Sequence, residues 1–269
     1  MRKTIKRPPV IFCHGFGVNW QLYEVLLPLK KLFSDHGMKL LIARTPFMNT
    51  LQMRAETLDK EVKRLVPHGE FHLIGHSMGG LDARHAICNS DWAGRCLSLT
   101  TVSTPHKGSA IAEEAERLIH TIDKIAHKNV FKMLPIVDKL SHFATSSLQS
   151  FKQLHPEYMV DKFNPQNPDH DKVKYFSLNF FVPKPFINYS VVHWMKLPYD
   201  LYHKTTGRPN DGLVCVESST WGESLGVFEG DHYSQTGPIP FNGKLQYKET
   251  FQKIIDNLIK SFPEESEAG

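Results

Sequence analysis

The feature that most constrains the fold of this sequence is a serine that lies between an apolar run and a helical pattern. The run Phe71-His72-Leu73-Ile74 leads into Gly75-His76-Ser77-Met78-Gly79, and helical spacing continues over Leu81–Cys88. Glycines on both sides of Ser77 permit a tight turn from a strand into a helix, with the hydroxyl exposed at its tip. The pattern therefore predicts a sheet whose strands are connected by helices.

The same alternation of strand and helix occupies the first hundred residues. Apolar runs of strand type occur at Val10–Cys13, Met38–Ala43, Phe71–Gly75 and Cys96–Ser103. Helical spacing lies between them, over Leu22–Phe33, Leu51–Val66 and Leu81–Cys88. Strands that alternate with helices pair in parallel through right-handed crossovers, so we predict an α/β protein with a mainly parallel sheet flanked by helices.

The alternation ends between about residues 108 and 170, where helical patterns continue without a clear strand. Leu118, Ile122 and Ile125 share one helical face, and a second apolar set spans Met133–Phe143. We predict that this segment is an inserted helical cap over the functional edge of the sheet. An ordinary helical layer of the core is the alternative.

Regular structure is expected again after the insertion. Val173–Leu178 has strand character, residues 180–202 form an aromatic and proline-rich loop, and Phe251–Phe262 forms an amphipathic helix. A chain of 269 residues fits one domain with an elaboration, given roughly 150 residues per domain. We therefore expect residues 1–269 to form a single domain, with the cap as an insertion near 108–170.

Composition excludes several classes of protein. Apolar runs are only a few residues long, far short of the roughly 20 that cross a bilayer. The net charge of +4 is weak, and no basic face with interleaved aromatic residues indicates nucleic-acid binding. The basic start and acidic end are expected to be solvated tails, and attraction of the start to an anionic lipid surface is left open.

The chain start and the cysteines bear on the compartment. The segment MRKTIKR leads into two prolines and the expected strand Val10–Cys13, without the apolar stretch of a signal peptide. We expect a cytoplasmic protein, and secretion by a leaderless route is left open. The four cysteines include no Cys-x-x-Cys and are expected to be free thiols, although Cys88 and Cys96 are close enough in sequence for a bridge.

Ser77 is the candidate nucleophile, and it requires a base and an orienting acid because a serine hydroxyl is a poor nucleophile at neutral pH. In folds of this kind the acid and then the histidine follow the serine along the chain. Asp211, before the strand-like Leu213–Val216, is the candidate acid, and His232 is the candidate base.

Other residues compete for these roles. Asp231 and Glu217 are the alternative acids. His193 and His203 precede the candidate acid, which is the wrong order for the base.

An oxyanion formed at the substrate carbonyl needs two converging N–H donors. The residue after the nucleophile, Met78, supplies one backbone N–H. The loop that follows Val10–Cys13 is glycine-rich, and the Phe16 N–H is the expected second donor. His14 is expected to hold this loop through hydrogen bonds.

With these segments in view, the sequence resembles the triacylglycerol lipases of the α/β-hydrolase superfamily, particularly Pseudomonas-type bacterial lipases and similar fungal enzymes. The resemblance covers roughly half of the chain and does not clearly include the cap. It rests on His14–Gly17, Ile74–Arg84, Ser103–Ser109 and Asn210–Val214.

The resemblance implies an α/β-hydrolase fold and hydrolysis of acyl esters, with triacylglycerol as the main expectation. The substrate would be a lipid or a small acyl ester, and contact with a lipid interface would be transient. The resemblance also implies that His106 is a local hydrogen-bond partner and that Asp82 and Arg84 are structural partners on the helix after Ser77. A general carboxylesterase, a phospholipase and an acyltransferase with the same triad remain alternatives, whereas the complete triad argues against an inactive binding protein.

One departure from the family concerns metal binding. Many Pseudomonas-type lipases hold a structural calcium through a carboxylate two residues beyond the catalytic histidine, where this sequence has Ser234. Calcium requires several oxygen ligands, including carboxylates, and the sequence also lacks a His-Glu-x-x-His zinc motif. We therefore expect no metal and no cofactor. The sequence does not indicate the acyl-chain preference or the oligomeric state.

Overall fold

The parallel sheet predicted from the sequence is present in the computed structural model, which describes residues 7–24, 27–112, 149–183, 199–200, 203–204, 206–238, 244 and 246–263. Within these residues six strands form one sheet in the order β2-β1-β3-β4-β5-β6, and neighbouring strands are parallel. The strands are β1 (Val10–Cys13), β2 (Leu40–Ile42), β3 (Phe71–His76), β4 (Cys96–Val102), β5 (Lys174–Phe181) and β6 (Glu223–Glu229).

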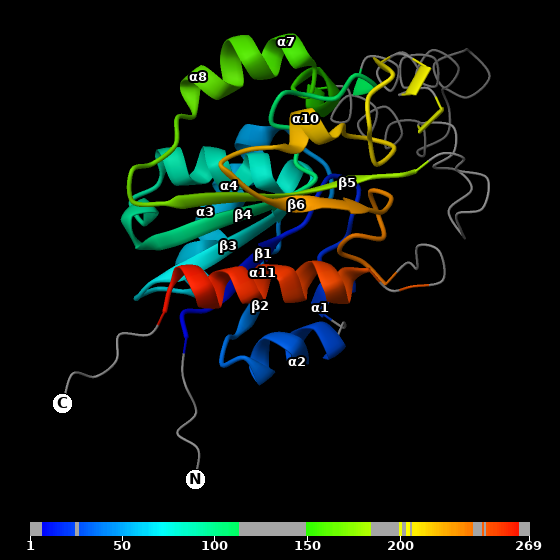
Figure 1. Ribbon diagram of the computed structural model, residues 1–269. Coiled ribbons are helices and arrows are strands. Elements are labelled where there is room, and N and C mark those ends of the chain that lie inside the picture. Colours follow the sequence, from blue (N-terminus) through cyan, green and yellow to red (C-terminus); the bar gives the residue numbers. More distant parts are fainter. Residues whose placement is uncertain are drawn as a thin grey trace, which may run out of the picture.

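Helices connect and cover these strands (Figure 1). The larger ones are α2 (Leu27–Asp35), α3 (Leu51–Leu65), α4 (Met78–Asn89) and α11 (Tyr247–Ser261). Shorter ones are α1 (Gln21–Glu24), the 3₁₀ turn η1 (Ala93–Arg95), α7 (Pro156–Tyr158), the π-helical turn η2 (Met159–Phe163), α8 (Asn164–Gln166) and α10 (Val216–Ser219).

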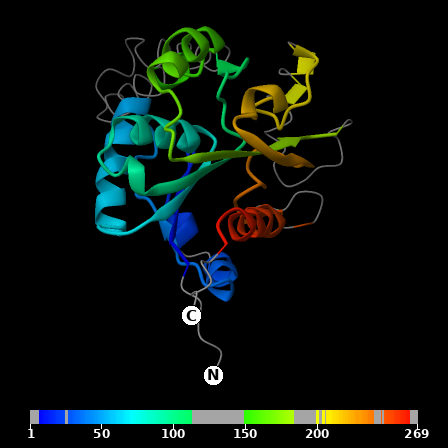
Figure 2. The ribbon, with the colours of Figure 1, turned by 60° about the vertical axis from the view of Figure 1, so that its left-hand side comes forward.

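The interior strand β1 shows how the sheet buries both of its faces. Val10 and Phe12 belong to a core cluster with residues of α2 and α11, whereas Ile11 and Cys13 belong to a cluster with α3 and α4. Figure 2 shows α3 and α4 on one side of the sheet and α11 on the other. Because both faces are covered, the strand is a continuous apolar run instead of an alternating one.

Two segments differ from the sequence-based expectation. β6 was not predicted, because it is an edge strand with mostly exposed or half-buried residues and therefore lacks an apolar run. The expected strand over Leu213–Val216 was wrong. There the Asp211 carboxylate accepts the N–H groups of Leu213 and Val214, which makes a turn, and α10 begins at Val216.

The structure describes part of the segment that the sequence predicts to be a cap. The segments α7, η2 and α8 follow one another from Pro156 to Gln166 and are hydrogen-bonded to α4, where Arg84 Nη1 donates to Asn164 Oδ1 over 2.7 Å. Residues 113–148, which hold most of the predicted cap, and residues 184–198 of the predicted aromatic loop lie outside the described residues. The cap therefore stays a prediction.

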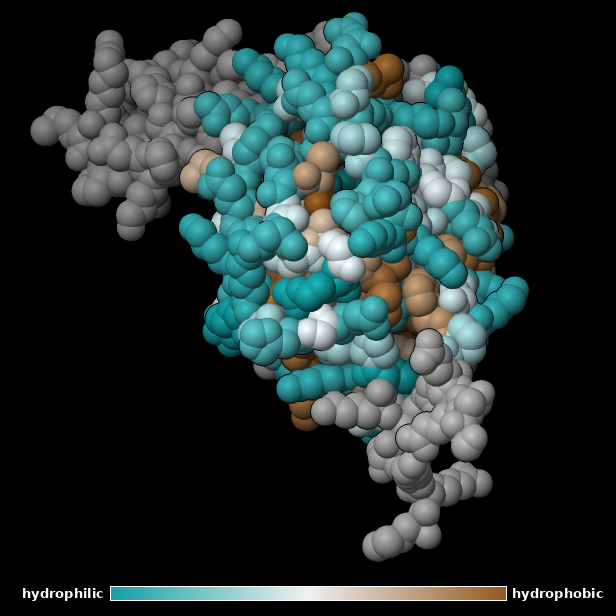
Figure 3. Space-filling model, turned by 90° about the vertical axis from the view of Figure 1, so that its left-hand side faces the viewer, coloured by the Kyte–Doolittle hydropathy of each residue, from teal (hydrophilic) through white to brown (hydrophobic). Residues whose placement is uncertain are grey.

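The strands run toward one end of the molecule, and their carboxyl ends meet there (Figure 1). The opposite end, viewed in Figure 3, is mainly hydrophilic with scattered hydrophobic side chains. Among the helices that the structure describes, none combines the length and the apolar composition needed to cross a membrane. All four cysteines, Cys13, Cys88, Cys96 and Cys215, are free thiols.

Candidate active site

Ser77 occupies a sharp turn between β3 and α4. Its backbone has φ 54° and ψ −131°, a conformation that costs free energy in any residue other than glycine. Its N–H donates to the Val102 carbonyl over 2.9 Å, and its own carbonyl accepts the Gly80 N–H over 3.0 Å. The neighbouring strand and the first helical turn therefore hold the serine from both sides.

The glycines around Ser77 are required by close packing. A Cβ atom on Gly75 would overlap the backbone of Gly80, and one on Gly79 would overlap the carbonyl groups of Cys13 and His14. The strand before the serine, the helix after it and β1 thus approach more closely than any side chain permits. This packing explains the Gly-x-Ser-x-Gly pattern in the sequence.

Asp211 and His232 come together in loops far apart in the sequence. The His232 Nδ1–H donates to Asp211 Oδ2 over 2.7 Å, and both side chains are buried. Burial alone would raise the pKa of Asp211, but the charge and hydrogen bond of His232, with donors from Gln235 and Val214, hold it below its ordinary value. Asp211 is therefore a carboxylate at neutral pH and can orient the imidazole.

Ser77 and His232 line the same cavity, of about 460 Å³. In the described part of the chain no hydrogen bond joins the Ser77 hydroxyl to the imidazole. Such catalytic hydrogen bonds often tighten only when substrate is bound. The structure thus brings the predicted nucleophile and base to one cavity, with the predicted acid behind the base.

The competing acids have other contacts. Asp231 is buried, and its Oδ1 accepts the N–H groups of Tyr233 and Ser234 over 2.9 and 3.1 Å. Burial raises the pKa of Asp231 despite these donors. Glu217 lies at the surface in an ion pair with Arg208, at 2.7 Å.

The two alternative histidines do not compete within the described structure. His203 stacks on Tyr199, with ring centroids 6.2 Å apart, and is not among the described residues that line the cavity. His193 lies outside the described residues.

The expected oxyanion donors, Phe16 and Met78, also line the cavity. Met78 is the first residue of α4, so its N–H has no partner within the helix. In the described chain the Phe16 N–H has no acceptor, whereas the next N–H, of Gly17, donates to the Phe47 carbonyl. A Cβ on Gly15 would lie 2.8 Å from the Ser77 Cβ, so this loop lies directly against the candidate nucleophile.

His14 and Arg54 hold the loop of Phe16. Burial and the nearby Arg54 charge lower the pKa of His14 to about 4, so its ring is neutral near pH 7. Its Nδ1 lies 2.8 Å from the Gly15 carbonyl and its Nε2 lies 3.0 Å from Thr45 Oγ1, as the predicted structural role requires. Arg54 Nη2 donates to the His14 carbonyl over 2.8 Å and also contacts Asp82 of α4.

His76, directly before Ser77, contacts the candidate base. Its Nε2–H donates to the His232 carbonyl over 3.0 Å, and the two rings lie 4.9 Å apart. Burial, and secondarily the charge of His232, lower the pKa of His76 to about 3. This second histidine is therefore a neutral support for the His232 loop.

Arg84 and His106 have the structural contacts that the resemblance implied. Arg84 lies 3.7 Å from the centroid of the Trp221 ring and donates to the Asn167 carbonyl over 3.0 Å. His106 stacks on Trp221 and its Nε2 lies 3.1 Å from Thr101 Oγ1. These contacts connect α4 to Asn167 and Trp221, and the loop after β4 to Trp221 and to β4 itself.

The cavity beside Ser77 is mainly apolar. Phe16 and Phe151 meet edge to face in its wall, with ring centroids 5.3 Å apart. The other apolar lining residues include Val18, Phe47, Met48, Ile111, Leu154, Leu213 and Val214. Such a wall can hold a hydrocarbon chain beside the serine.

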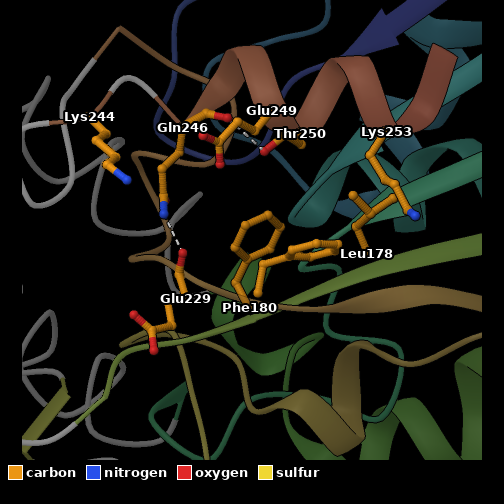
Figure 4. A pocket seen from close by; sticks show the side chains of 9 residues that line it. Leu178, Phe180, Glu229, Lys244, Gln246, Glu249, Thr250 and Lys253 are labelled. Atoms are coloured by element: carbon orange, nitrogen blue, oxygen red, sulfur yellow. Dashed lines mark hydrogen bonds between the residues drawn. The ribbon is translucent and has the colours of Figure 1, made fainter. Parts of the chain in front are cut away.

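A second cavity, of about 260 Å³, lies between α11 and the ends of β5 and β6 (Figure 4). Phe180 and Leu178 form its floor, and Glu229, Gln246 and Lys253 are among its polar lining residues. None of the predicted catalytic residues lines it.

No group of three or more histidine, cysteine, aspartate or glutamate side chains that could hold a metal occurs in the described part of the chain. Ser234 stands at the position where the resemblance to Pseudomonas-type lipases would imply a calcium ligand. Its hydroxyl contacts the Asp231 carbonyl at 3.0 Å in its own loop and Gln246 Oε1 at 2.9 Å at the start of α11.

Three residues of the site were missed by sequence reasoning. Gln235 Nε2 donates to Asp211 Oδ2 over 2.8 Å, Arg54 supports the Phe16 loop, and His76 supports the His232 loop. The position of His76 next to Ser77 was a usable signal. Arg54 lies in the first turn of the amphipathic helix α3, and nothing in the sequence around it indicates its partners.

The fold and the site together define a class of protein. A parallel sheet with a serine at a strained strand-to-helix turn, followed in chain order by an aspartate and a histidine, is the arrangement of the α/β hydrolases. Solved structures agree at the level of the fold. The mature lipase of Bacillus licheniformis aligns with 94% of this chain and 92% of its own, at a TM-score of 0.67 and 19% identity. A metagenomic carboxyl esterase aligns with 93% and 76%, at a TM-score of 0.69 and 18% identity.

Sequence comparison gives the family. A relative described as triacylglycerol lipase 2 of Saccharomyces cerevisiae is 36% identical over 233 residues, which is 83% of this chain. A triacylglycerol lipase of Burkholderia plantarii is 30% identical over 124 residues, 43% of this chain. A family model described as a PGAP1-like alpha/beta domain matches residues 48–171. The chain is a triacylglycerol lipase-like α/β hydrolase, which confirms the predicted resemblance.

The chain is shorter than these curated relatives. It spans 64% of the length of the yeast protein and 34% of the Burkholderia protein.

Proposed function

We propose that this chain is a serine ester hydrolase that cleaves acyl esters, with triacylglycerol as its main substrate. One observation carries the proposal: the buried Asp211–His232 pair, joined over 2.7 Å, reaches the cavity in which Ser77 is held in a strained turn. The names of the yeast and bacterial relatives support the same activity.

In the proposed reaction Ser77 Oγ attacks the ester carbonyl while His232 Nε2 takes the hydroxyl proton. Asp211 fixes the imidazole and stabilises its positive charge. The N–H groups of Phe16 and Met78 bind the oxyanion. His232 then returns the proton to the leaving alcohol, and water, activated by the same histidine, hydrolyses the acyl-enzyme.

The cavity lining supports a neutral lipid ester. The described residues that line it include no aspartate, glutamate, lysine or arginine. A phospholipid would bring a charged headgroup close to the scissile ester, and an uncompensated charge in an apolar site is costly. This argument favours triacylglycerol over a phospholipid.

We also propose that the insertion near 108–170 forms a cap over this cavity. Both of its described ends reach the site, because Ile111 at one end and Phe151 and Leu154 at the other line the cavity. A variant with a short Gly-Ser linker in place of residues 113–148 tests this. We expect it to retain cleavage of short soluble esters and to lose cleavage of emulsified triacylglycerol, whereas equal effects on both would contradict a cap.

The activity is tested with p-nitrophenyl esters of increasing chain length, extended to a triacylglycerol emulsion. We expect turnover of long-chain and emulsified substrates, and a loss in kcat on the order of 10⁴-fold or more in Ser77→Ala. Activity confined to short soluble esters would leave a general carboxylesterase. Acyl transfer to an added alcohol in preference to water would indicate an acyltransferase, and unchanged activity in Ser77→Ala would refute the triad.

A further inference from the structure

Gln235 shares the oxygen atom through which the candidate acid holds the candidate base. Its Nε2 donates to Asp211 Oδ2 over 2.8 Å, and His232 Nδ1 donates to the same oxygen over 2.7 Å. The other carboxylate oxygen, Oδ1, accepts the N–H groups of Leu213 and Val214. Both contacts of Oδ2 are buried, and Gln235 is wholly inaccessible to solvent.

The His232 loop is shaped so that two side chains reach Asp211. Asp231 accepts the N–H groups of Tyr233 and Ser234, which turns the chain directly after His232. Because of this turn, Gln235 returns to the carboxylate three residues after the histidine. A carboxylate only accepts hydrogen bonds, so the amide must present its nitrogen to Asp211.

We propose that Gln235 is a positioning residue that fixes the Asp211 carboxylate toward His232 and moderates the basicity of the imidazole. The role in catalysis rests on the proposed function of the triad. The amide N–H places the positive end of a dipole against Oδ2 and takes up part of its negative charge. Less of that charge remains to stabilise the imidazolium that forms when His232 accepts the Ser77 proton.

Other titratable groups face His232 but do not contact that oxygen. His76 of β3 packs 4.9 Å from the His232 ring and is bonded to the backbone of His232. Asp231 and Tyr233 flank it on its own loop, and Tyr233 meets its ring edge to face. Among the described residues only His232 and Gln235 donate to Asp211 Oδ2. A substitution of Gln235 therefore changes one contact of the Asp211–His232 pair and leaves its other charged neighbours in place.

The direct test is an NMR titration of the His232 imidazole in the full chain with labelled histidine, with the signal assigned from the spectrum of His232→Gln. Gln235→Met keeps the length of the side chain and removes the donor. We expect the titration midpoint of His232 to move upward by on the order of half a pH unit. Gln246→Met is the matched control, because Gln246 supports the same loop through Ser234 without touching Asp211. In this control the titration midpoint of His232 should not move.

Kinetics give the second measurement. In Gln235→Met the acid limb of the kcat/KM profile should move upward with the NMR midpoint, and kcat should fall about 10-fold at unchanged KM because the base is less well oriented. A residue that only supports the fold would lower the melting temperature and leave the acid limb in place. A folded Gln235→Met protein with an unchanged midpoint and limb would overturn the proposal.

A second substitution at position 235 is needed in case Gln235→Met does not fold. Gln235→Leu also removes the donor to Asp211, with a more compact side chain, and should also raise the His232 midpoint. Failure of both variants to fold would assign Gln235 a purely structural role and overturn the proposal. The titration does not depend on turnover, so it separates the two proposals. If the chain has no esterase activity but the His232 midpoint still moves in Gln235→Met, the proposed function is refuted, whereas the role of the Gln235–Asp211 contact is supported.

Discussion

At the scale of single residues, the site shifts the pKa values of two neighbouring aspartates in opposite directions. Asp211 has a pKa below its ordinary value, since the favourable contacts with His232, Gln235 and Val214 outweigh burial. Asp231 has a raised pKa, because burial outweighs the two backbone donors that it caps. Groups whose surroundings push their pKa values apart are suited to different roles. We therefore propose that Asp211 orients the His232 imidazole and that Asp231 stabilises the turn in the His232 loop.

Exchange of each aspartate for asparagine tests this assignment. Asp211→Asn should lower kcat on the order of 10⁴-fold, because an asparagine can donate to Nδ1 and select the wrong imidazole tautomer. Asp231→Asn should lower kcat by no more than about 10-fold, since the side-chain oxygen that accepts the Tyr233 and Ser234 N–H groups is retained. Initial rates on one p-nitrophenyl ester, with melting temperatures for both proteins, decide the matter. A larger loss in Asp231→Asn would reverse the assignment.

Gly15 offers a second residue-scale test, because its Cα lies against the nucleophile. The Cβ of Gly15→Ala would lie 2.8 Å from the Ser77 Cβ and must push the loop of Phe16 away. We expect kcat to fall about 10²-fold, the loss typical of one misplaced oxyanion donor. Gly94→Ala is the control, because no atom lies within 4 Å of the added Cβ and activity should be unchanged. Full activity in Gly15→Ala would contradict the role of this loop.

At the scale of elements, one buried ion pair connects three parts of the site. Arg54 of α3 places Nε and Nη2 each 2.8 Å from Asp82 Oδ2 on α4, and both side chains are fully buried. The same guanidinium donates to the carbonyls of His14 and Pro46, in the loops that follow β1 and β2. The helix that starts at the nucleophile is thereby tied to the loop of the expected oxyanion donor.

The costs of substituting the two partners should not be additive. Arg54→Met leaves the Asp82 charge buried without a partner, and we expect it to lower the free energy of unfolding by about 3–5 kcal/mol. Arg54→Met combined with Asp82→Leu removes both charges and should cost less than the sum of the two single changes. Urea unfolding of the four proteins of this cycle measures the coupling. Strict additivity would show that the pair contributes nothing beyond its separate parts.

Elements that bury both faces are those that the sequence predicts well. β1, β3 and β4 are buried along almost their whole length because helices cover both sides of the sheet, and α11 has one clear apolar face. β6 could not be predicted, because an edge strand exposes polar residues and is stabilised mainly by its ladder with β5. Ser77, Asp211 and His232 were proposed from motif and chain order. Gln235 and Arg54 act through contacts between distant segments, which one sequence does not reveal.

At the scale of the whole molecule, the sheet region encloses four histidines that folding keeps neutral. They lie at the carboxyl end of β1, within β3, at the end of β3 and after β4, and they are His14, His72, His76 and His106. Burial, the largest cause in each case, lowers the pKa of His14 and His72 to about 4, that of His76 to about 3, and that of His106 well below its ordinary value. The fold is thus built around groups that an unfolded chain would protonate below about pH 6.5.

This predicts a fold that loses stability in mild acid. Each folded pKa is lower than the unfolded value, so each histidine's contribution is complete above about pH 6.5 and is lost as the pH falls toward the folded value. Each group changes the free energy of unfolding by up to about 1.4 kcal/mol per pH unit in that window. Together they can remove a typical stability of roughly 5–15 kcal/mol before pH 4. Urea unfolding at a series of pH values between 7 and 4 should show the decline.

His72, which lies outside the site, allows the effect of histidine protonation on stability to be measured separately from catalysis. His72 contacts Ser98 Oγ at 2.8 Å and lies among neither the catalytic candidates nor the cavity lining. His72→Gln removes the titrating group, so it should reduce the slope of unfolding free energy against pH by about 1.4 kcal/mol per pH unit, whatever its effect at pH 7. His68→Gln, at an exposed position, should leave the slope unchanged. An equal slope in all three proteins would mean that protonation of the buried histidines does not drive the acid unfolding.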